Sequence, residues 1–172
     1  QTMWMATKKI TTKKRRKKKG GRYKTGIHVS SKCLNEMKYR SGWELIVAIH
    51  FDQDDSVESY AYEPIAIEYI SNIRSGKVRR YYPDFLVNYT NGTRILVEVK
   101  RLNQLNNLIV QKKAKAAEEW CKKQNQKIDY QFWTDHIVKS LKRIQDSRAT
   151  QTSETSPKKT GATLLKKSRK TK

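Results

Sequence analysis

The chain has 172 residues, with 38 Lys or Arg against 16 Asp or Glu, and a formal net charge of +22. This length predicts one compact domain with tails. No apolar run approaches the length of a membrane span and no signal peptide is evident, so we expect no membrane partner.

The positive charge is concentrated at the two ends of the chain. Residues 1–24 carry a net charge of +11 and residues 139–172 carry +9, which leaves +2 between them. We expect a basic N-terminal arm over residues 1–26, a domain over residues 27–138 and a basic C-terminal tail over the remainder. Such arms repel one another unless a polyanion neutralises them, and nucleic acid is the commonest such partner. An import signal or a solubility tag is the alternative interpretation of the arm.

The two cysteines, Cys33 and Cys121, are far apart in the sequence, and we expect both to be free thiols. His28 and Cys33 could begin a zinc site, but no second pair of ligands follows them. We therefore expect no zinc and a cytosolic, reducing compartment.

Helical periodicity appears in three places. A first helix should begin at Ser41, after an irregular segment over residues 27–39. Its apolar positions recur at the spacing of one helix face, namely Trp43, Ile46, Val47 and His50. A longer helix is predicted over residues 103–124 and a short one over residues 134–144, after which no period survives.

Strand-like runs lie between the first two helices. They cover residues 57–62, 65–70, 78–89 and 94–100, and another strand is predicted over residues 128–133. Asn91-Gly92 indicates a hairpin. The order of elements predicts an α/β (α+β) fold in which a mixed β-sheet is flanked by helices.

The register of this hairpin decides which side chains share a face. A strict two-residue turn would place Phe85 opposite Glu98 and mix apolar with polar side chains. A three- or five-residue loop, or one bulge, instead places Phe85 opposite Val97, and Asp84 opposite Glu98 beside Lys100. Burial favours this second register because one face of the hairpin then becomes wholly apolar.

That register brings two carboxylates together beside a lysine. Two such carboxylates repel one another unless a cation lies between them, and oxygen ligands completed by water suit Mg²⁺ or Mn²⁺. We therefore predict Asp84 and Glu98 as metal ligands, which would activate a bound water and polarise a phosphodiester. Lys100 would orient the attacking water or stabilise charge on the phosphate oxygens. A solvent-facing cluster of charged side chains is the alternative interpretation.

Two further carboxylates are candidates for the same site. Glu44 stands three residues after Ser41, so it can act in the site or close the start of the helix as part of a capping box. Glu63 stands at the end of a strand, where an ordinary exposed glutamate is the preferred interpretation.

Several cations are predicted to contact DNA. In the arm these are Lys13, Lys14, Arg15, Arg16, Lys17, Lys18, Lys19 and Arg22. In the domain they are Arg40, Lys112 and Lys115, of which the last two share one side of the long helix and could equally form a solvated face. The aromatic side chains of Tyr81, Tyr82 and Trp120 are predicted to pack rather than to stack on bases.

The spacing of the acidic residues resembles a known nuclease superfamily. Tyr82-Pro83-Asp84, thirteen intervening residues and Glu98-Val99-Lys100 look like the PD-(D/E)xK superfamily, and Tyr39 to Glu44 resembles its helix-borne glutamate. The combination is similar to the TnsA-type endonuclease branch and, with Tyr23 to His28, to the head-completion nuclease of tailed phages. The resemblance covers residues 22–134.

The resemblance implies a restriction-endonuclease-like fold. Within it, Asp84 and Glu98 would bind the metal, Glu44 would join them as the third acidic residue and metal ligand, and Lys100 would be the catalytic lysine. All four are thus candidate catalytic residues.

The implied activity is Mg²⁺- or Mn²⁺-dependent DNA cleavage that processes phage DNA during head completion or packaging. The expected setting is the host cytoplasm and the virion. DNA is the expected partner, phage portal or neck proteins are further candidates, and no small-molecule cofactor is expected. One alternative is a virion structural protein of the head or neck that binds DNA and retains the nuclease fold. Another is a Holliday-junction resolvase or repair nuclease.

Overall fold

The computed structural model describes residues 24–154 of the chain. The arm cations predicted at residues 13–19 and 22 lie outside the described residues, as does most of the predicted C-terminal tail. Within the described part, no helix is both long enough and apolar enough to cross a membrane.

The described residues form a mixed α/β structure, which confirms the predicted fold class. In chain order the elements are β1 (Gly26–His28), β2 (Met37–Tyr39), α1 (Gly42–Gln53), β3 (Val57–Tyr62), β4 (Ile67–Asn72), β5 (Lys77–Tyr81), β6 (Phe85–Tyr89), β7 (Arg94–Val99), the 3-10 helix η1 (Leu102–Gln104), α2 (Leu108–Lys122), β8 (Ile128–Trp133) and α3 (Asp135–Glu154).

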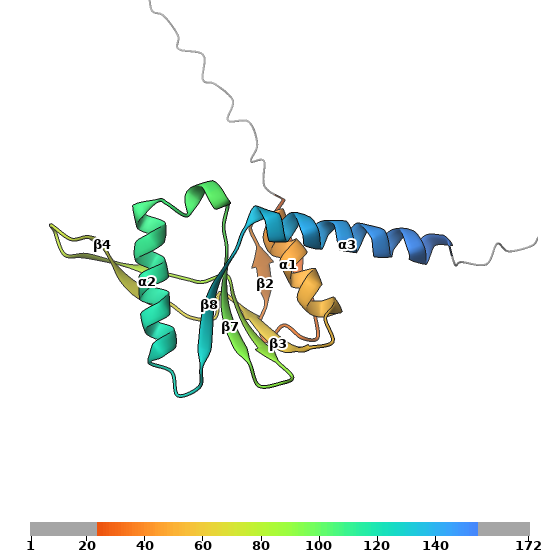
Figure 1. Cartoon of the computed structure of the whole chain (residues 1–172), viewed down its shortest axis with the longest axis horizontal. Helices are drawn as coiled ribbons and strands as arrows, with labels where there is room; N and C mark the ends of the chain where they lie inside the picture. Colours follow the sequence, from red (N-terminus) through yellow and green to blue (C-terminus); the bar gives the residue numbers. More distant parts are fainter. Residues whose placement is uncertain (1–23, 155–172) are drawn as a thin grey trace, which may run out of the picture.

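The central sheet has four strands in the order β3-β6-β7-β8. Strand β6 is antiparallel to both β3 and β7, and β8 runs parallel to β7, so the sheet is mixed as predicted. Helices α1 and α3 lie on one side of this sheet and α2 lies on the other (Figure 1). The strands β4 and β5 form a separate hairpin that projects outward beside α2 (Figure 1).

The hairpin between β6 and β7 has the predicted register. Phe85 pairs with Val97, and the pairing continues to the loop, where the Tyr89 N–H donates to the Thr93 carbonyl at 2.9 Å. The loop therefore has three residues rather than two. Gly92 has a φ of 81°, a left-handed conformation that three-residue hairpin loops require and that glycine adopts without strain.

Both faces of the central sheet are buried. On the α1 face the core includes Val47, Phe51, Tyr60, Phe85 and Val97. On the α2 face it includes Ile67, Tyr69, Tyr81, Leu96 and Ala117. Successive residues of β7 thus serve opposite cores, because side chains alternate along a strand.

One predicted strand is wrong. Residues 78–89 do not form a single strand, because β5 ends at Tyr81 and pairs with β4, whereas β6 begins at Phe85 in the central sheet. Pro83 lies between them and has no N–H to donate to a strand ladder, so the run breaks there. Asp84 consequently stands at the junction of the two sheets.

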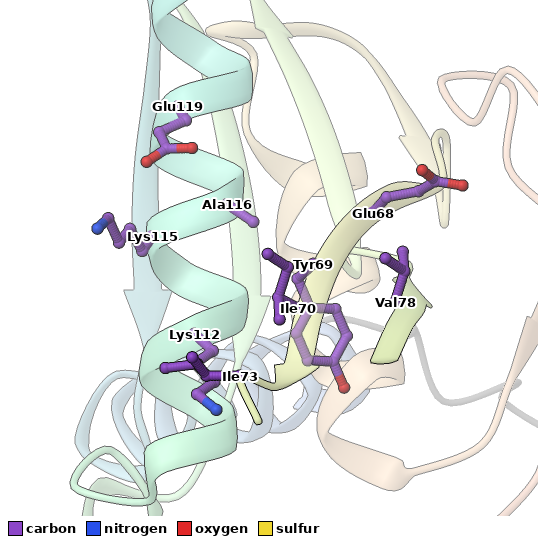
Figure 2. Close-up of a pocket in the computed structure, with 9 residues that line it drawn as sticks. All are labelled: Glu68, Tyr69, Ile70, Ile73, Val78, Lys112, Lys115, Ala116 and Glu119. Atoms are coloured by element: carbon purple, nitrogen blue, oxygen red, sulfur yellow. The ribbon is translucent and has the colours of Figure 1, made fainter. Parts of the chain in front are cut away.

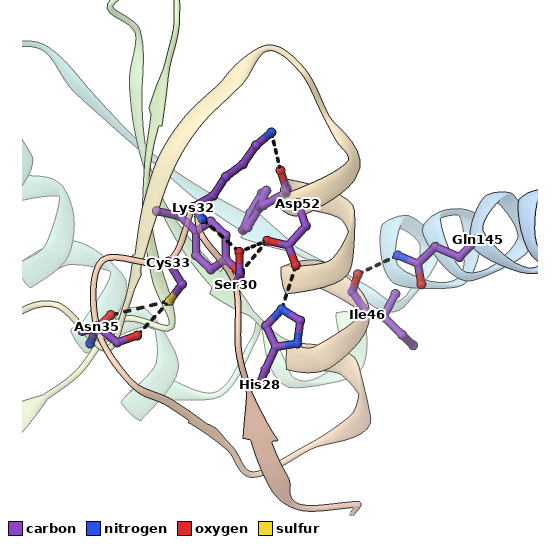
Figure 3. A network of polar contacts seen from close by, with 10 residues as sticks. His28, Ser30, Lys32, Cys33, Asn35, Ile46, Asp52 and Gln145 are labelled. Atoms are coloured by element: carbon purple, nitrogen blue, oxygen red, sulfur yellow. Dashed lines mark hydrogen bonds and ion pairs between the residues drawn. The ribbon is translucent and has the colours of Figure 1, made fainter.

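The segment predicted as irregular over residues 27–39 contains the β1–β2 hairpin instead. A polar network attaches this segment to α1 (Figure 3). The Asp52 carboxylate accepts hydrogen bonds from Ser30 and from the Tyr60 hydroxyl at 2.9 Å, and its other oxygen lies 2.7 Å from His28 Nε2. Cys33 and Cys121 are free thiols, as predicted.

Two helix boundaries also differ from the prediction. Helix α2 begins at Leu108 because the Asn107 side chain caps it, accepting from the Ile109 N–H at 2.8 Å. Helix α3 continues to Glu154, past the predicted helix end at residue 144 and across residue 138, where we expected the domain to end. Gln145 contributes to this extension by donating from Nε2 to the Ile46 carbonyl of α1 at 2.8 Å.

Candidate active site

The structure brings the four predicted catalytic residues to one cavity of about 360 Å³. Asp84 immediately precedes β6, Glu98 lies in β7, Lys100 follows that strand, and Glu44 comes from the first turn of α1. The side chains that line the cavity belong to Arg40, Glu44, Glu63, Arg80, Tyr81, Tyr82, Asp84, Glu98, Val99, Lys100 and Lys113.

Glu98 is a buried acidic residue of this cavity, with 4% of its surface exposed. Its Oε1 lies 2.7 Å from the Lys100 ammonium, and its Oε2 accepts a hydrogen bond from the Tyr81 hydroxyl at 2.8 Å. The Tyr81 hydroxyl also lies 3.0 Å from the Tyr130 hydroxyl. A buried charge is retained only when it is paired and hydrogen-bonded, and Glu98 has both kinds of partner.

Replacing Tyr81 with phenylalanine should destabilise the fold by about 1–3 kcal/mol, because a buried carboxylate oxygen of Glu98 would lose its donor. Tyr130→Phe is the matched control, since it removes a hydroxyl from the same pair but leaves the bond to Glu98 intact. Urea unfolding of both variants measures the difference. Equal losses in the two variants would show that the bond to Glu98 contributes nothing specific.

Lys100 carries a positive charge at neutral pH. Burial alone would lower its pKa, but attraction and hydrogen bonding to Glu98, with further attraction to Asp84 and Glu44, outweigh burial and raise the pKa above its ordinary value. A lysine in this state donates hydrogen bonds and attracts anions, and it does not accept a proton.

The surroundings of Asp84 disfavour its charged form, whereas those of Lys100 favour the charged form. Its Oδ2 accepts the Val99 N–H at 2.7 Å, which favours the charged carboxylate. Burial and the negative charges of Glu98 and Glu44 nevertheless raise the pKa of Asp84 well above its ordinary value. The cavity therefore contains a carboxylate that a nearby cation would stabilise.

Glu44 both caps α1 and lines the cavity. Its N–H donates to Ser41 Oγ at 3.2 Å, as the predicted capping box requires. The carboxylate, however, reaches the Arg40 N–H at 2.8 Å rather than the backbone N–H of Ser41. The same oxygen, Oε2, also accepts from the Tyr62 hydroxyl at 2.8 Å.

Glu63 is better connected than an ordinary exposed glutamate, so the preferred interpretation of this residue needs correction. It has a φ of 45°, a left-handed conformation uncommon outside glycine, and its N–H donates to the Asp84 carbonyl at 2.9 Å. Its carboxylate forms an ion pair with Arg40, and both side chains line the cavity. Strained backbone of this kind is often found at functional sites.

Lys112 and Lys115 do not line this cavity. They lie in a separate groove of about 520 Å³ between α2 and the β4–β5 hairpin (Figure 2). There Lys112 donates from Nζ to the Ser71 carbonyl at 3.0 Å. The cation that α2 contributes to the cavity is instead Lys113, whose ammonium lies 5.2 Å from the centre of the Tyr81 ring.

Sequence reasoning therefore missed three members of the cavity. Tyr81 was expected only to pack, although its hydroxyl reaches Glu98. Lys113 and Arg80 were not singled out at all. The sequence contained one usable signal, because Arg80 and Tyr81 lie just before the Tyr82-Pro83-Asp84 motif.

The residues of the cavity fit a Mg²⁺-type ion better than a closed structural metal site. No three His, Cys, Asp or Glu side chains in residues 24–154 are arranged to hold a metal ion. Mg²⁺ does not require such a cage, since it commonly uses one or two carboxylates together with water and substrate phosphates. Asp84 and Glu98 supply two carboxylates, and no described residue donates to Asp84 Oδ1.

The fold and this cavity together define a restriction-endonuclease-like domain. Residues 54–135 match the family model of the TnsA-like endonuclease N-terminal domain. The matched segment contains Asp84, Glu98 and Lys100, while Glu44 lies outside it. The match supports a nuclease that acts on DNA. No curated protein matched the sequence of the chain.

Proposed function

We propose that this protein is a metal-dependent DNA endonuclease whose catalytic residues are Glu44, Asp84, Glu98 and Lys100. The observation that carries the proposal is the meeting of two carboxylates and a charged lysine in one cavity. That cavity lies within the segment matched to an endonuclease family.

Each side chain has a distinct part in the proposed hydrolysis. A divalent ion bound by Asp84 and Glu98 would supply Lewis-acid polarisation of the phosphodiester. Lys100, protonated at neutral pH, donates hydrogen bonds to the phosphate oxygens as negative charge develops on them. Water attacks phosphorus and gives a proton to solvent, the bond from phosphorus to the leaving oxygen breaks, and that oxygen takes up a proton from solvent to leave as a hydroxyl group.

The other cavity residues would hold the substrate. Arg40, Arg80 and Lys113 line the cavity beside the acidic residues and can bind the phosphates that flank the cleaved bond. Contacts of this kind position DNA without reading its sequence, so we expect weak sequence preference and steep salt dependence.

The biological setting of the proposal rests on the resemblance of the N-terminal motifs to the head-completion nuclease of tailed phages. In that setting the enzyme trims phage DNA as packaging ends. It would act in the host cytoplasm and associate with the virion, in contact with portal or neck proteins.

The full chain is expected to cleave DNA in Mg²⁺ or Mn²⁺ and to lose this activity in excess chelator, because the two carboxylates need the ion to act on a phosphodiester. Linear and branched DNA, incubated side by side and analysed on denaturing gels, test the proposal. Undiminished cleavage in chelator would contradict metal dependence. Absence of cleavage with every divalent ion would favour a structural DNA-binding protein, and cleavage confined to four-way junctions would favour a resolvase.

A further inference from the structure

Two further hollows lie beside the proposed active site. The cavity shares Glu44, Val99 and Lys100 with a second hollow of about 470 Å³. This second hollow shares Trp43 and Arg101 with a third of about 530 Å³. The shared residues place the three hollows side by side, in a row that runs from the proposed site of cleavage past Trp43 and Arg101.

The Trp43–Arg101 pair lies where the second and third hollows adjoin. The Arg101 guanidinium carbon lies 5.5 Å from the centroid of the Trp43 ring. Each member is the immediate chain neighbour of a proposed catalytic residue, since Trp43 precedes Glu44 and Arg101 follows Lys100. The pair therefore lies beside the proposed catalytic residues, with one member in α1 and the other two residues after the end of β7.

Arg101 has no other structural partner that would explain its position. Its side chain is exposed, and it forms no ion pair with any residue between 24 and 154. By contrast, the other charged groups of the third hollow are engaged with one another. Asp135 accepts the Leu102 N–H at 3.0 Å and lies 3.5 Å from the Lys139 ammonium.

A planar cation placed over an indole suits one class of ligand in particular. Nucleobases stack on aromatic rings and on guanidinium planes, and the adjacent phosphates are attracted to the same charge. The second hollow adds Lys24 and Lys100, which favour a polyanionic strand. A base within a duplex presents only its edges, so only an unpaired base can stack here.

We propose that Trp43 and Arg101 form a binding site for an unpaired nucleotide of a DNA strand that leaves the active-site cavity. The site deepens the proposed nuclease function and rests on it for its orientation toward the cleaved bond. DNA with a single-stranded segment next to the cleaved bond is then the favoured substrate over continuous duplex.

Arg101→Lys is the decisive substitution, because it keeps the positive charge and removes the planar group. Arg101 is exposed, so this variant should fold like the wild type, which thermal unfolding checks. Arg74→Lys is the matched control, since it makes the same substitution at an exposed arginine that lines none of the three hollows. Affinities for a single-stranded and a duplex oligonucleotide are measured for each chain in chelator, where cleavage does not interfere.

The proposal predicts that Arg101→Lys weakens single-strand binding by roughly fivefold or more, in line with about 1 kcal/mol for one stacked base. Duplex binding should change by less than about twofold. A 2-aminopurine base in the single strand should lose its stacking signal in the variant. Equal affinities for both DNA forms in the wild type, or unchanged single-strand binding by Arg101→Lys, would overturn the proposal.

These measurements test the nucleotide-binding site independently of the proposed nuclease activity. Binding in chelator requires no catalysis, so the single-strand preference and its loss in Arg101→Lys stand even if the wild type cleaves nothing. Conversely, wild-type cleavage with an unchanged Arg101→Lys binding profile removes the nucleotide site and leaves the nuclease proposal in place.

Discussion

Lys100→Ala is expected to lower the rate of DNA cleavage by about 100-fold or more, the usual cost of removing one preorganised donor at a developing negative charge. Lys100 is charged at neutral pH and is held 2.7 Å from Glu98, so its ammonium is fixed at the proposed site of reaction. Because the loss concerns the transition state, DNA affinity should change little by comparison. Single-turnover cleavage with enzyme in excess measures the effect directly.

Lys127→Ala provides the control for loss of one positive charge, because Lys127 lies outside the cavity. It should retain a cleavage rate within about twofold of the wild type, since a remote surface charge acts on the reaction only weakly. Unimpaired cleavage by Lys100→Ala would place the active site elsewhere on the chain. Fold retention of the variant is checked by thermal unfolding, because removing Lys100 leaves the buried Glu98 without its cation.

Asp84→Asn is expected to abolish detectable metal-dependent cleavage and, at neutral pH, to raise the melting temperature. The pKa of Asp84 is raised in the folded state by burial and by Glu98, so its ionised form destabilises the fold. Asparagine has no charge to bury, and its side-chain oxygen can still accept the Val99 N–H. A stabilisation of about 1 kcal/mol would appear as a rise of roughly 2–4 °C in a chain of this size.

The pH dependence of this gain has a definite sign. A carboxyl whose pKa is higher in the folded state binds its proton more tightly there, so folding becomes more favourable as the pH falls through that pKa. The advantage of Asp84→Asn should thus be greatest at neutral pH and shrink as the pH falls toward the ordinary value of 3.8. Melting curves of wild type and variant across this range, recorded without divalent ions, test it. A variant less stable than wild type at neutral pH would contradict the electrostatic assignment.

The site residues that the sequence predicted follow from burial and from the alternation of side chains along a strand. Only one register of the β6–β7 hairpin makes Phe85 and Val97 share an apolar face, and in that register Asp84 and Glu98 line one cavity close enough to repel one another. The capping role of Glu44 likewise follows from local spacing, because its partner Ser41 is three residues away. Both inferences depend on contacts within one hairpin or one helical turn.

Tyr81 and Lys113, which the sequence did not predict as members of the site, reach the cavity through contacts between elements far apart in the sequence. Tyr81 reaches Glu98 only because the chain leaves the β4–β5 hairpin at Pro83 and enters a different sheet. Lys113 lines the cavity because the face of α2 that carries it is turned toward the cavity. The sequence spacing instead favoured Lys112 and Lys115, which line a different groove. Packing orientation between distant elements is set by the whole core, so periodicity alone could not rank these lysines.

The two tasks of Glu44 have a consequence for the history of such proteins. Its carboxylate is bonded to Arg40 and Tyr62 and closes the start of α1, whether or not any DNA is cut. A descendant that lost catalytic activity could replace Lys100 without losing function, but replacing Glu44 would still destabilise the start of α1. Retention of this glutamate in a relative is therefore poor evidence that the relative is an active enzyme, whereas retention of the lysine is informative.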